Sequence, residues 1–254
     1  MSADNIAIIT GAARRIGHEI TRTLAEAGFY VALHTSARSQ PQAETLAADL
    51  RASGKKAVVV VANLENADEV ATIVPHVAKT LGPVTLLVNN ASIFEEDTAM
   101  ALDPANLDRH MAINLRAPLI LSSALANQLP HGTKGNIINI IDQRVWRLNP
   151  KYFSYTLSKA ALWTATQTLA QSLAPHIRVN AIGPGPTLAN SRQDTVEFAK
   201  EARAVLLQQT VEPAEIASAM LYLVRARSVT GQMIAVDGGQ HLAWRTPDVV
   251  GSPE

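Results

Sequence analysis

A phenol and an ammonium lie four residues apart in the run Tyr-Thr-Leu-Ser-Lys, at Tyr155 and Lys159. On a helix this spacing is about one turn, so both side chains point to the same face. A tyrosine with its usual pKa of about 10 exchanges protons poorly at neutral pH, and a nearby cation stabilises the phenolate and lowers that pKa. We therefore predict that Tyr155 transfers a proton with the help of Lys159. The spacing also arises by chance, so the assignment depends on the motifs that accompany it.

A turn rich in small residues occupies positions 10–17, with the sequence Thr-Gly-Ala-Ala-Arg-Arg-Ile-Gly, directly after an apolar run. Small residues let the backbone approach a pyrophosphate, and the free N–H groups at the start of the next helix attract its negative charge. The turn predicts a dinucleotide site, with contacts from Gly11, Arg14, Arg15, Ile16 and Gly17. The alternative is an ordinary turn between a strand and a helix.

The segment after the second apolar run, residues 34–39, reads His-Thr-Ser-Ala-Arg-Ser and contains no carboxylate. A site for NAD normally presents Asp or Glu here to the ribose 2′-hydroxyl, whereas guanidinium groups suit a 2′-phosphate. The segment therefore predicts NADPH rather than NADH, with contacts from Arg14, His34, Ser36, Arg38 and Ser39. The alternative is that the two arginines are solvated surface cations.

The elements that must position these groups alternate along the chain. Apolar and β-branched runs predict seven strands, at 6–10, 30–34, 57–61, 85–89, 136–141, 177–182 and 233–236. Helical periodicity predicts helices at roughly 15–28, 41–53, 67–81, 104–129, 153–173 and 213–226. This alternation is typical of an α/β domain with a parallel sheet, whose strands are apolar throughout because helices cover both faces. The valine-rich run at 57–61 predicts a central, buried strand.

The domain organisation is simple, because no linker or repeat interrupts the series. We predict one domain over residues 1–254. Residues 183–209 combine prolines, glycines and polar residues, and they predict a substrate flap. Residues 240–254 form a C-terminal tail that either packs on a neighbouring subunit or frays.

Composition argues against several classes of function. The 22 basic and 22 acidic residues cancel, so no overall charge favours nucleic acid or an anionic membrane. The absence of cysteine excludes disulfides, thiolate catalysis and cysteine-ligated metal, and the seven histidines are scattered, so we predict no metal site. Since the apolar runs are too short for an export signal or a membrane span, we expect a cytoplasmic protein that acts on a small molecule.

Further motifs follow one another along nearly the whole chain: the glycine-rich turn, Asn89-Asn90-Ala91, Asn114, the Tyr155–Lys159 pair, Gly183-Pro184-Gly185 and Asp237-Gly238-Gly239. In order and spacing they resemble the short-chain dehydrogenase/reductase family. The resemblance implies a single doubly wound Rossmann-type domain, usually in a homotetramer or homodimer.

The resemblance also implies roles for individual residues. Tyr155 relays the substrate proton, Lys159 holds the nicotinamide ribose and Asn114 anchors a water of the proton relay. Asn63 stands where the family commonly has an aspartate that contacts adenine, and it can form its hydrogen bond either way round. The further cofactor contacts that it implies are Asn63, Leu64, Asn90, Ala91, Ser92, Lys159, Pro184 and Gly185.

Four departures from the family pattern point to one branch of it. Asp142 stands where most members have serine, Arg15 replaces the middle glycine of the first turn, and Ser92 with Phe94 follows Asn89-Asn90-Ala91. Together with Leu33-His34 and Arg38-Ser39, they look like the pteridine reductase branch, which includes bacterial dihydromonapterin and dihydrofolate reductases. The implied substrate contacts are Arg15, Ser92, Phe94, Asp142, Tyr155 and Gly185.

A physical interpretation supports this branch. A pterin is flat, so Phe94 could cover the face opposite the nicotinamide, and a partly protonated Asp142 could pass a proton to a ring nitrogen. There are alternatives for each residue: Phe94 packs on the core, Arg15 pairs with a carboxylate, or an ionised Asp142 raises the pKa of Tyr155 and opposes Lys159. At the level of function, the alternatives are a carbonyl or alcohol oxidoreductase and a non-catalytic NADPH sensor or scaffold.

Overall fold

The computed structural model describes residues 5–187 and 203–244. Its centre is a seven-stranded sheet in which every pairing is parallel, with the order β3-β2-β1-β4-β5-β6-β7. The strands are β1 (Ile6–Thr10), β2 (Tyr30–Thr35), β3 (Ala57–Val61), β4 (Leu86–Asn89), β5 (Gly135–Ile140), β6 (Ile177–Pro184) and β7 (Met233–Val236). Each lies within two residues of the range predicted from the sequence.

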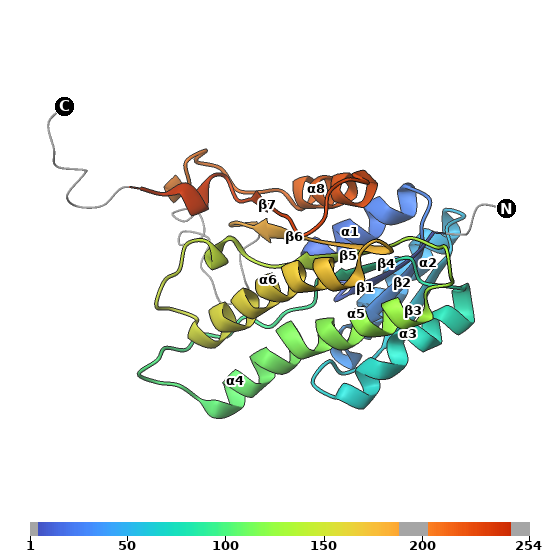
Figure 1. The fold of residues 1–254 in the computed structure, drawn as a ribbon, viewed down its shortest axis with the longest axis horizontal. Helices are drawn as coiled ribbons and strands as arrows, with labels where there is room; N and C mark the ends of the chain where they lie inside the picture. Colours follow the sequence, from blue (N-terminus) through green and yellow to red (C-terminus); the bar gives the residue numbers. More distant parts are fainter. Residues whose placement is uncertain (1–4, 188–202, 245–254) are drawn as a thin grey trace, which may run out of the picture.

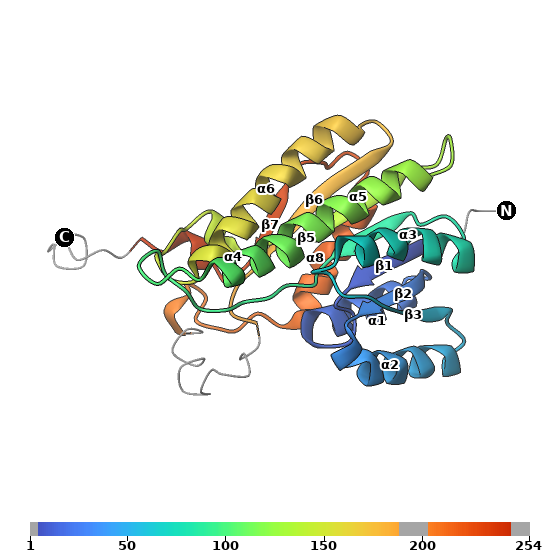
Figure 2. The same cartoon turned by 90° about the horizontal axis from the view of Figure 1, so that it is seen from below.

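Helices cover both faces of the sheet (Figure 1, Figure 2). One face carries α1 (Arg15–Glu26), α2 (Gln40–Ala52) and α8 (Pro213–Arg225). The other carries α3 (Ala67–Leu81), α4 (Pro104–Met111), α5 (Ala117–Gln128) and α6 (Phe153–Leu173). The predicted Rossmann-type α/β domain is therefore confirmed.

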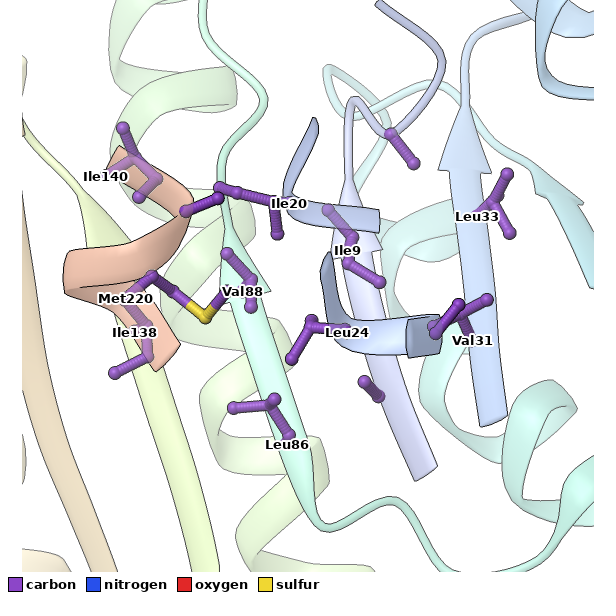
Figure 3. Packing of buried hydrophobic residues seen from close by; sticks show 14 of the residues in the cluster. Ile9, Ile20, Leu24, Val31, Leu33, Leu86, Val88, Ile138, Ile140 and Met220 are labelled. Atoms are coloured by element: carbon purple, nitrogen blue, oxygen red, sulfur yellow. The ribbon is translucent and has the colours of Figure 1, made fainter. Parts of the chain in front are cut away.

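A large apolar core packs against each face of the sheet, beneath the helices of that face. Figure 3 shows Ile20 and Leu24 of α1 and Met220 of α8 packed over side chains of β1, β2, β4 and β5. Because successive side chains of a strand point to opposite faces, Ile9 enters this core while Ile8 enters the core beneath α3 and α5. Burial on both faces fixes the carboxyl ends of the strands, from which the loops of the site extend.

The prediction of a central strand at 57–61 is wrong, because β3 is the edge strand of the sheet. Its last residue, Val61, is 41% exposed. The run is still apolar, since Val59 packs against the core beneath α1 and α2, and Val58 and Val60 pack against the core beneath α3. A β-branched run thus indicates that helices cover both faces of a strand, and it does not indicate the position of the strand in the sheet.

The helix predicted at 104–129 is interrupted. After α4 ends at Met111, a π-helical turn covers Ala112–Arg116 before α5 begins. Pro118 accounts for the change, because proline has no N–H to donate to the carbonyl four residues earlier, which belongs to Asn114. π-Helical turns within α-helices often occur at functional sites. This one places the buried Asn114 against the loop that follows β4.

The strand order reverses between β1 and β4, and ligands of open α/β sheets bind in the crevice outside the carboxyl ends of the strands at such a point. The predicted flap at 183–209 and tail at 240–254 extend into residues 188–202 and 245–254, which lie outside the described residues. The tail begins with a short 3₁₀ helix, Gln240–Leu242. Across 5–187 and 203–244, no helix combines the length and the apolar character that a bilayer crossing requires.

Candidate active site

The glycine-rich turn joins β1 to α1 at the crevice, and hydrogen bonds from Asn90 stabilise its conformation. The Asn90 amide nitrogen donates to the carbonyls of Thr10 (2.8 Å) and Gly11 (3.2 Å), while Thr10 Oγ1 accepts the N–H groups of Asn90 and Ala91. A Cβ atom at Gly17 would lie 2.1 Å from the Gly11 carbonyl oxygen, so only glycine fits there. Asn90 and Ala91 therefore shape the predicted phosphate-binding turn from the end of β4.

Arg15 begins α1 with a φ of 54°, in the left-handed region that glycine adopts readily and other residues rarely do. A non-glycine residue held there costs about 1–3 kcal/mol. Both Arg14 and Arg15 are exposed at the turn, and partial burial, followed by the charge of Arg14, lowers the pKa of Arg15. A strained arginine at the mouth of a turn that could bind phosphate points to a function for its guanidinium group.

His34, at the end of β2, is buried beneath the turn instead of facing the crevice. Its Nδ1 accepts the Gly11 N–H at 3.4 Å, which assigns the proton to Nε2, and Nε2 lies 3.2 Å from the Ala62 carbonyl oxygen. Burial lowers the pKa of His34 to about 4, against the favourable backbone bond to Ala62. The predicted cofactor contact at His34 is therefore better described as support for the Gly11 turn.

This buried imidazole predicts a dependence of stability on pH. Between a folded pKa of about 4 and an unfolded pKa of about 6.5, the unfolded chain binds more protons at this site than the folded chain. The free energy of unfolding should therefore fall as the pH drops through this window, by about 3 kcal/mol in total. Denaturant unfolding at several pH values checks this. The His34→Asn variant keeps an acceptor for Gly11 and does not titrate, so its slope against pH should be shallower; an unchanged slope would contradict the assignment.

The residues predicted to select the cofactor lie around a 3₁₀ turn, Ala37–Ser39, directly after β2. Ser36 and Arg38 are exposed, whereas Ser39 is buried and its N–H donates to the Ser36 carbonyl at 3.0 Å. The structure therefore leaves the Arg38 guanidinium and the Ser36 hydroxyl facing solvent beside the crevice.

Asn63 and Leu64 follow β3 at the same edge of the sheet. Asn63 Oδ1 accepts the Glu65 N–H at 3.0 Å, which directs its NH₂ group outward. Asn63 keeps both its amide donors and a second lone pair of Oδ1, so the contact with adenine stays a prediction. Leu64 is buried and belongs to the core beneath α3.

Tyr155 and Lys159 lie in the first two turns of α6, and Asp142 reaches them from the end of β5. The Tyr155 hydroxyl donates to Asp142 Oδ2 at 2.9 Å, and the Lys159 ammonium donates to the Ile140 carbonyl at 2.8 Å. Tyr155 and Lys159 are 6% and 2% exposed. The helical spacing therefore places both groups on one buried face, with Asp142 as the direct partner of the phenol.

Burial dominates the electrostatics of these three groups. It raises the pKa of Asp142, while the backbone N–H of Arg144, the Arg144 charge and the Tyr155 bond act in the opposite direction. It also raises the pKa of Tyr155 well above its usual value, with the Asp142 charge and hydrogen bond adding to the effect. Burial lowers the pKa of Lys159 to about 8, against the attraction of Asp142. The lowered phenol pKa expected beside Lys159 is thus not found in the protein alone, because burial and Asp142 raise it and the Arg144 charge opposes them only in part.

Asn114 holds the loop after β4 against α6. Its side-chain oxygen accepts the Ile93 N–H at 3.0 Å and the Ser92 hydroxyl at 3.1 Å, and its NH₂ group donates to the Ile93 carbonyl and to Ser158 Oγ. These bonds use the side chain fully. The side chain therefore offers no free group for the water that the resemblance assigns to Asn114.

Phe94, which the sequence predicted, belongs to an aromatic cluster beside the phenol whose other member, Tyr152, was missed. The ring of Phe94 stacks on Tyr152, with centroids 4.0 Å apart and planes 12° apart, and meets Tyr155 edge to face at 4.6 Å. The guanidinium carbon of Arg144 lies 5.1 Å from the Tyr152 ring centre and 5.5 Å from that of Phe94. Tyr152 therefore covers one face of Phe94. Neither Tyr152 nor Arg144 belongs to a motif that would have identified it.

Pro184 and Gly185 close the site at the carboxyl end of β6. A Cβ atom at Gly185 would lie 2.5 Å from Asp237 Cα, so glycine is required for the close approach to the end of β7. The Gly185 N–H donates to the Val236 carbonyl at 2.9 Å. The predicted site residues from β1, β4, β5 and β6 therefore line one edge of the sheet.

The groups at this edge fit a dinucleotide. A helix N-terminus with two arginines suits a pyrophosphate, the 3₁₀ turn after β2 offers a guanidinium and a hydroxyl, and a buried ammonium lies beside the phenol. For metals, the part of the chain that the structure describes holds no cluster of three or more His, Cys, Asp or Glu side chains. The donor set thus matches an organic cofactor.

Comparisons with known proteins agree with this geometry. A family model described as "Enoyl-(Acyl carrier protein) reductase" matches residues 11–241. The chain is 30% identical to the 3-oxoacyl-(acyl-carrier-protein) reductase FabG of Staphylococcus epidermidis over 93% of this chain and 98% of that protein.

Solved structures give a finer comparison. FolM alternative dihydrofolate reductase 1 of Brucella canis, complexed with NADP, superposes with a TM-score of 0.94 at 51% identity, covering 98% of each chain. A blue fluorescent protein from a metagenomic library, in complex with NADPH, superposes with a TM-score of 0.87 at 33% identity, covering 92% of this chain and 97% of that one. The first of these matches the pteridine reductase-like branch indicated by the sequence, and the chain belongs to the short-chain dehydrogenase/reductase family of nicotinamide-dependent oxidoreductases.

Proposed function

We propose that the protein is an NADPH-dependent reductase that acts on a C=N bond of a pteridine or dihydrofolate-type substrate. The observation that carries the proposal is the 2.9 Å hydrogen bond between the Tyr155 hydroxyl and Asp142, a carboxyl group where most of the family has serine. The similarity to FolM, named as a dihydrofolate reductase and crystallised with NADP, supports it.

The chemistry requires one hydride and one proton. NADPH supplies the hydride to the carbon of the C=N bond when bound. The nitrogen of that bond must gain a proton, and the Asp142–Tyr155 pair offers an acidic hydrogen at the site. Burial keeps Asp142 protonated to a higher pH than a solvated aspartate, so it can act as the acid.

Other residues hold the reactants in place. Lys159, on the same face of α6, would bind the nicotinamide ribose. Phe94 and Gly185 would enclose the substrate, and Arg15 would contact its edge and the phosphates. Ser92, bonded to Asn114, would border the nicotinamide.

The proposal is tested by following NADPH oxidation with dihydrobiopterin, dihydromonapterin and dihydrofolate. We expect turnover with at least one of them. Because the chain is also 30% identical to a 3-oxoacyl reductase, carbonyl reduction is the second candidate, and a panel of ketones belongs in the same assay. Turnover of ketones alone would replace the first proposal by the second.

Preference for NADPH should depend on Arg38. Replacing Arg38 by glutamine removes the cation next to the expected 2′-phosphate, and loss of a charge-assisted hydrogen bond corresponds to about a 10- to 100-fold weaker binding. We expect the Kd for NADPH, measured by its fluorescence, to rise by this factor while the Kd for NADH changes little. Arg22→Gln on the outer face of α1 is the matched control. Equal changes for both cofactors would show that Arg38 does not contact the phosphate.

A further inference from the structure

The start of α6 is capped from a distant part of the chain. Asp97, 57 residues before Ser154, accepts the Ser154 N–H with both carboxylate oxygens, at 3.0 and 3.3 Å, and also accepts the Ser154 hydroxyl. The Phe153 N–H donates to the Asp97 carbonyl at 3.3 Å. The residue that precedes the helix, Tyr152, has a φ of 56° and forms no side-chain cap. Asp97 therefore does what a local capping residue normally does.

This cap is well placed to fix the position of the phenol. The first N–H groups of a helix have no partner within it, and a negative charge there is also favoured by the helix dipole. Asp97 is 7% exposed, so water competes little for these bonds. Tyr155 is the residue directly after Ser154, and its backbone position follows from the bonds that Asp97 makes.

The same carboxylate belongs to the loop that carries Phe94. Hydrogen bonds anchor the loop on both sides of Phe94 in the chain. Before Phe94, the Ile93 N–H donates to Asn114 Oδ1, and after it, the Glu95 N–H donates to His110 Nε2 at 3.3 Å. Phe94 contacts both Tyr152 and Tyr155. Asp97 thus joins the loop that would cover the substrate to the helix that would deliver its proton.

We propose that Asp97 is a positioning residue that sets the placement of Phe94 relative to the Tyr155 hydroxyl. It acts through Ser154 and the backbone of α6, and it touches neither substrate nor cofactor. The roles of Phe94 and Tyr155 rest on the proposed function, whereas the coupling between loop and helix does not.

The kinetic test compares Asp97→Ala with Asp103→Ala, a matched change at the residue that caps α4 by accepting the Ala105 N–H at 3.0 Å. A displacement of about 1 Å can cost up to a hundredfold in rate, so Asp97→Ala should lower kcat by about 10- to 100-fold and raise KM for the substrate. The Kd for NADPH should change less than KM, because the Gly11 turn and Arg38, which would bind its phosphates, lie elsewhere. Asp97→Asn keeps an acceptor and loses the charge, and it should recover most of the activity, to within about two- to fivefold of wild type. Asp103→Ala should leave kcat unchanged.

A second measurement needs no substrate. Hydrogen exchange of the backbone amides should become faster at 92–97 and at 153–156 together in Asp97→Ala, and should be unchanged there in Asp103→Ala. If Asp97→Ala fails to fold, Ser154→Ala removes the side-chain bond alone and should show the same paired change to a smaller degree. A loss of thermal stability with kcat within twofold of wild type, or faster exchange in only one of the two segments, would overturn the proposal. Absence of pterin turnover in the wild-type protein would defeat the proposed function. The hydrogen-exchange experiment would still decide whether Asp97 couples the loop to the helix.

Discussion

Replacing Tyr155 by phenylalanine should lower kcat by about 10²- to 10⁴-fold, the range that a single acid–base group contributes. The change removes only the hydroxyl that donates to Asp142. The ring remains, so its edge-to-face contact with Phe94 at 4.6 Å and the shape of the pocket are kept. KM for the substrate and Kd for NADPH should therefore change little, and the loss should appear in kcat.

The control for this variant is Tyr222→Phe, the same chemical change on the exposed side of α8, where the side chain is 57% exposed. Steady-state kinetics and NADPH fluorescence on both proteins check the prediction. More than a tenth of wild-type turnover in Tyr155→Phe would exclude the phenol from the proton relay. If the wild-type protein binds NADPH but turns over none of the substrates, a non-catalytic NADPH-binding protein would be favoured.

The protein alone holds this phenol in its neutral form. Burial and the neighbouring Asp142 raise the pKa of Tyr155, and Lys159 donates its hydrogen bond to the Ile140 carbonyl, with its nitrogen 5.8 Å from the centre of the Tyr155 ring. A neutral phenol still carries its hydrogen, but the raised pKa makes it a weaker acid than a solvated tyrosine. Asp142 is therefore the stronger acid of the pair, and the phenol takes part in proton transfer as its hydrogen-bonded partner.

The fold could be predicted almost completely because its signals are local. Apolar runs and helical periodicity located the strands and most helices within two residues. The errors came from interactions that are not local. β3 is the edge strand because the chain crosses from it to β4, on the other side of β1. The composition of the strand does not indicate this crossover. The break at Asn114 depends on Pro118, a signal that was present in the sequence and was not used.

The site could be predicted only where a family motif marked it. Tyr155, Asp142 and Phe94 were identified from motif positions, and Tyr155 contacts each of the other two. Asp97 and Tyr152 were missed, because Asp97 acts on a helix 57 residues away and Tyr152 acts through ring stacking. These contacts form only in the folded chain, so no spacing in the sequence predicts them.

Asp142 separates the two candidate chemistries. Reduction of a pterin C=N bond needs an acid for the ring nitrogen, and Asp142→Ser removes that carboxyl group while restoring the residue that most of the family has. We expect kcat for pterin or dihydrofolate reduction to fall by about 10²- to 10⁴-fold, because the proton then lacks its acid. Any ketone reduction by the same variant should persist, since a hydroxyl can still bond to Tyr155. Comparison of the two substrate classes on one protein serves as the internal control.

The pH profile supplies an independent criterion for the same residue. Burial raises the pKa of Asp142, so its protonated form persists to higher pH than in a solvated aspartate and is lost as the pH rises through that pKa. In wild type, kcat for a pterin should therefore decline on the alkaline side of this transition, and Asp142→Asn, which cannot release a proton, should lack it. Arg144, whose charge lies 4.0 Å from Asp142, opposes the effect of burial, so Arg144→Gln should move the transition to higher pH. A pterin profile that is identical in wild type and Asp142→Asn would mean that the proton comes from elsewhere.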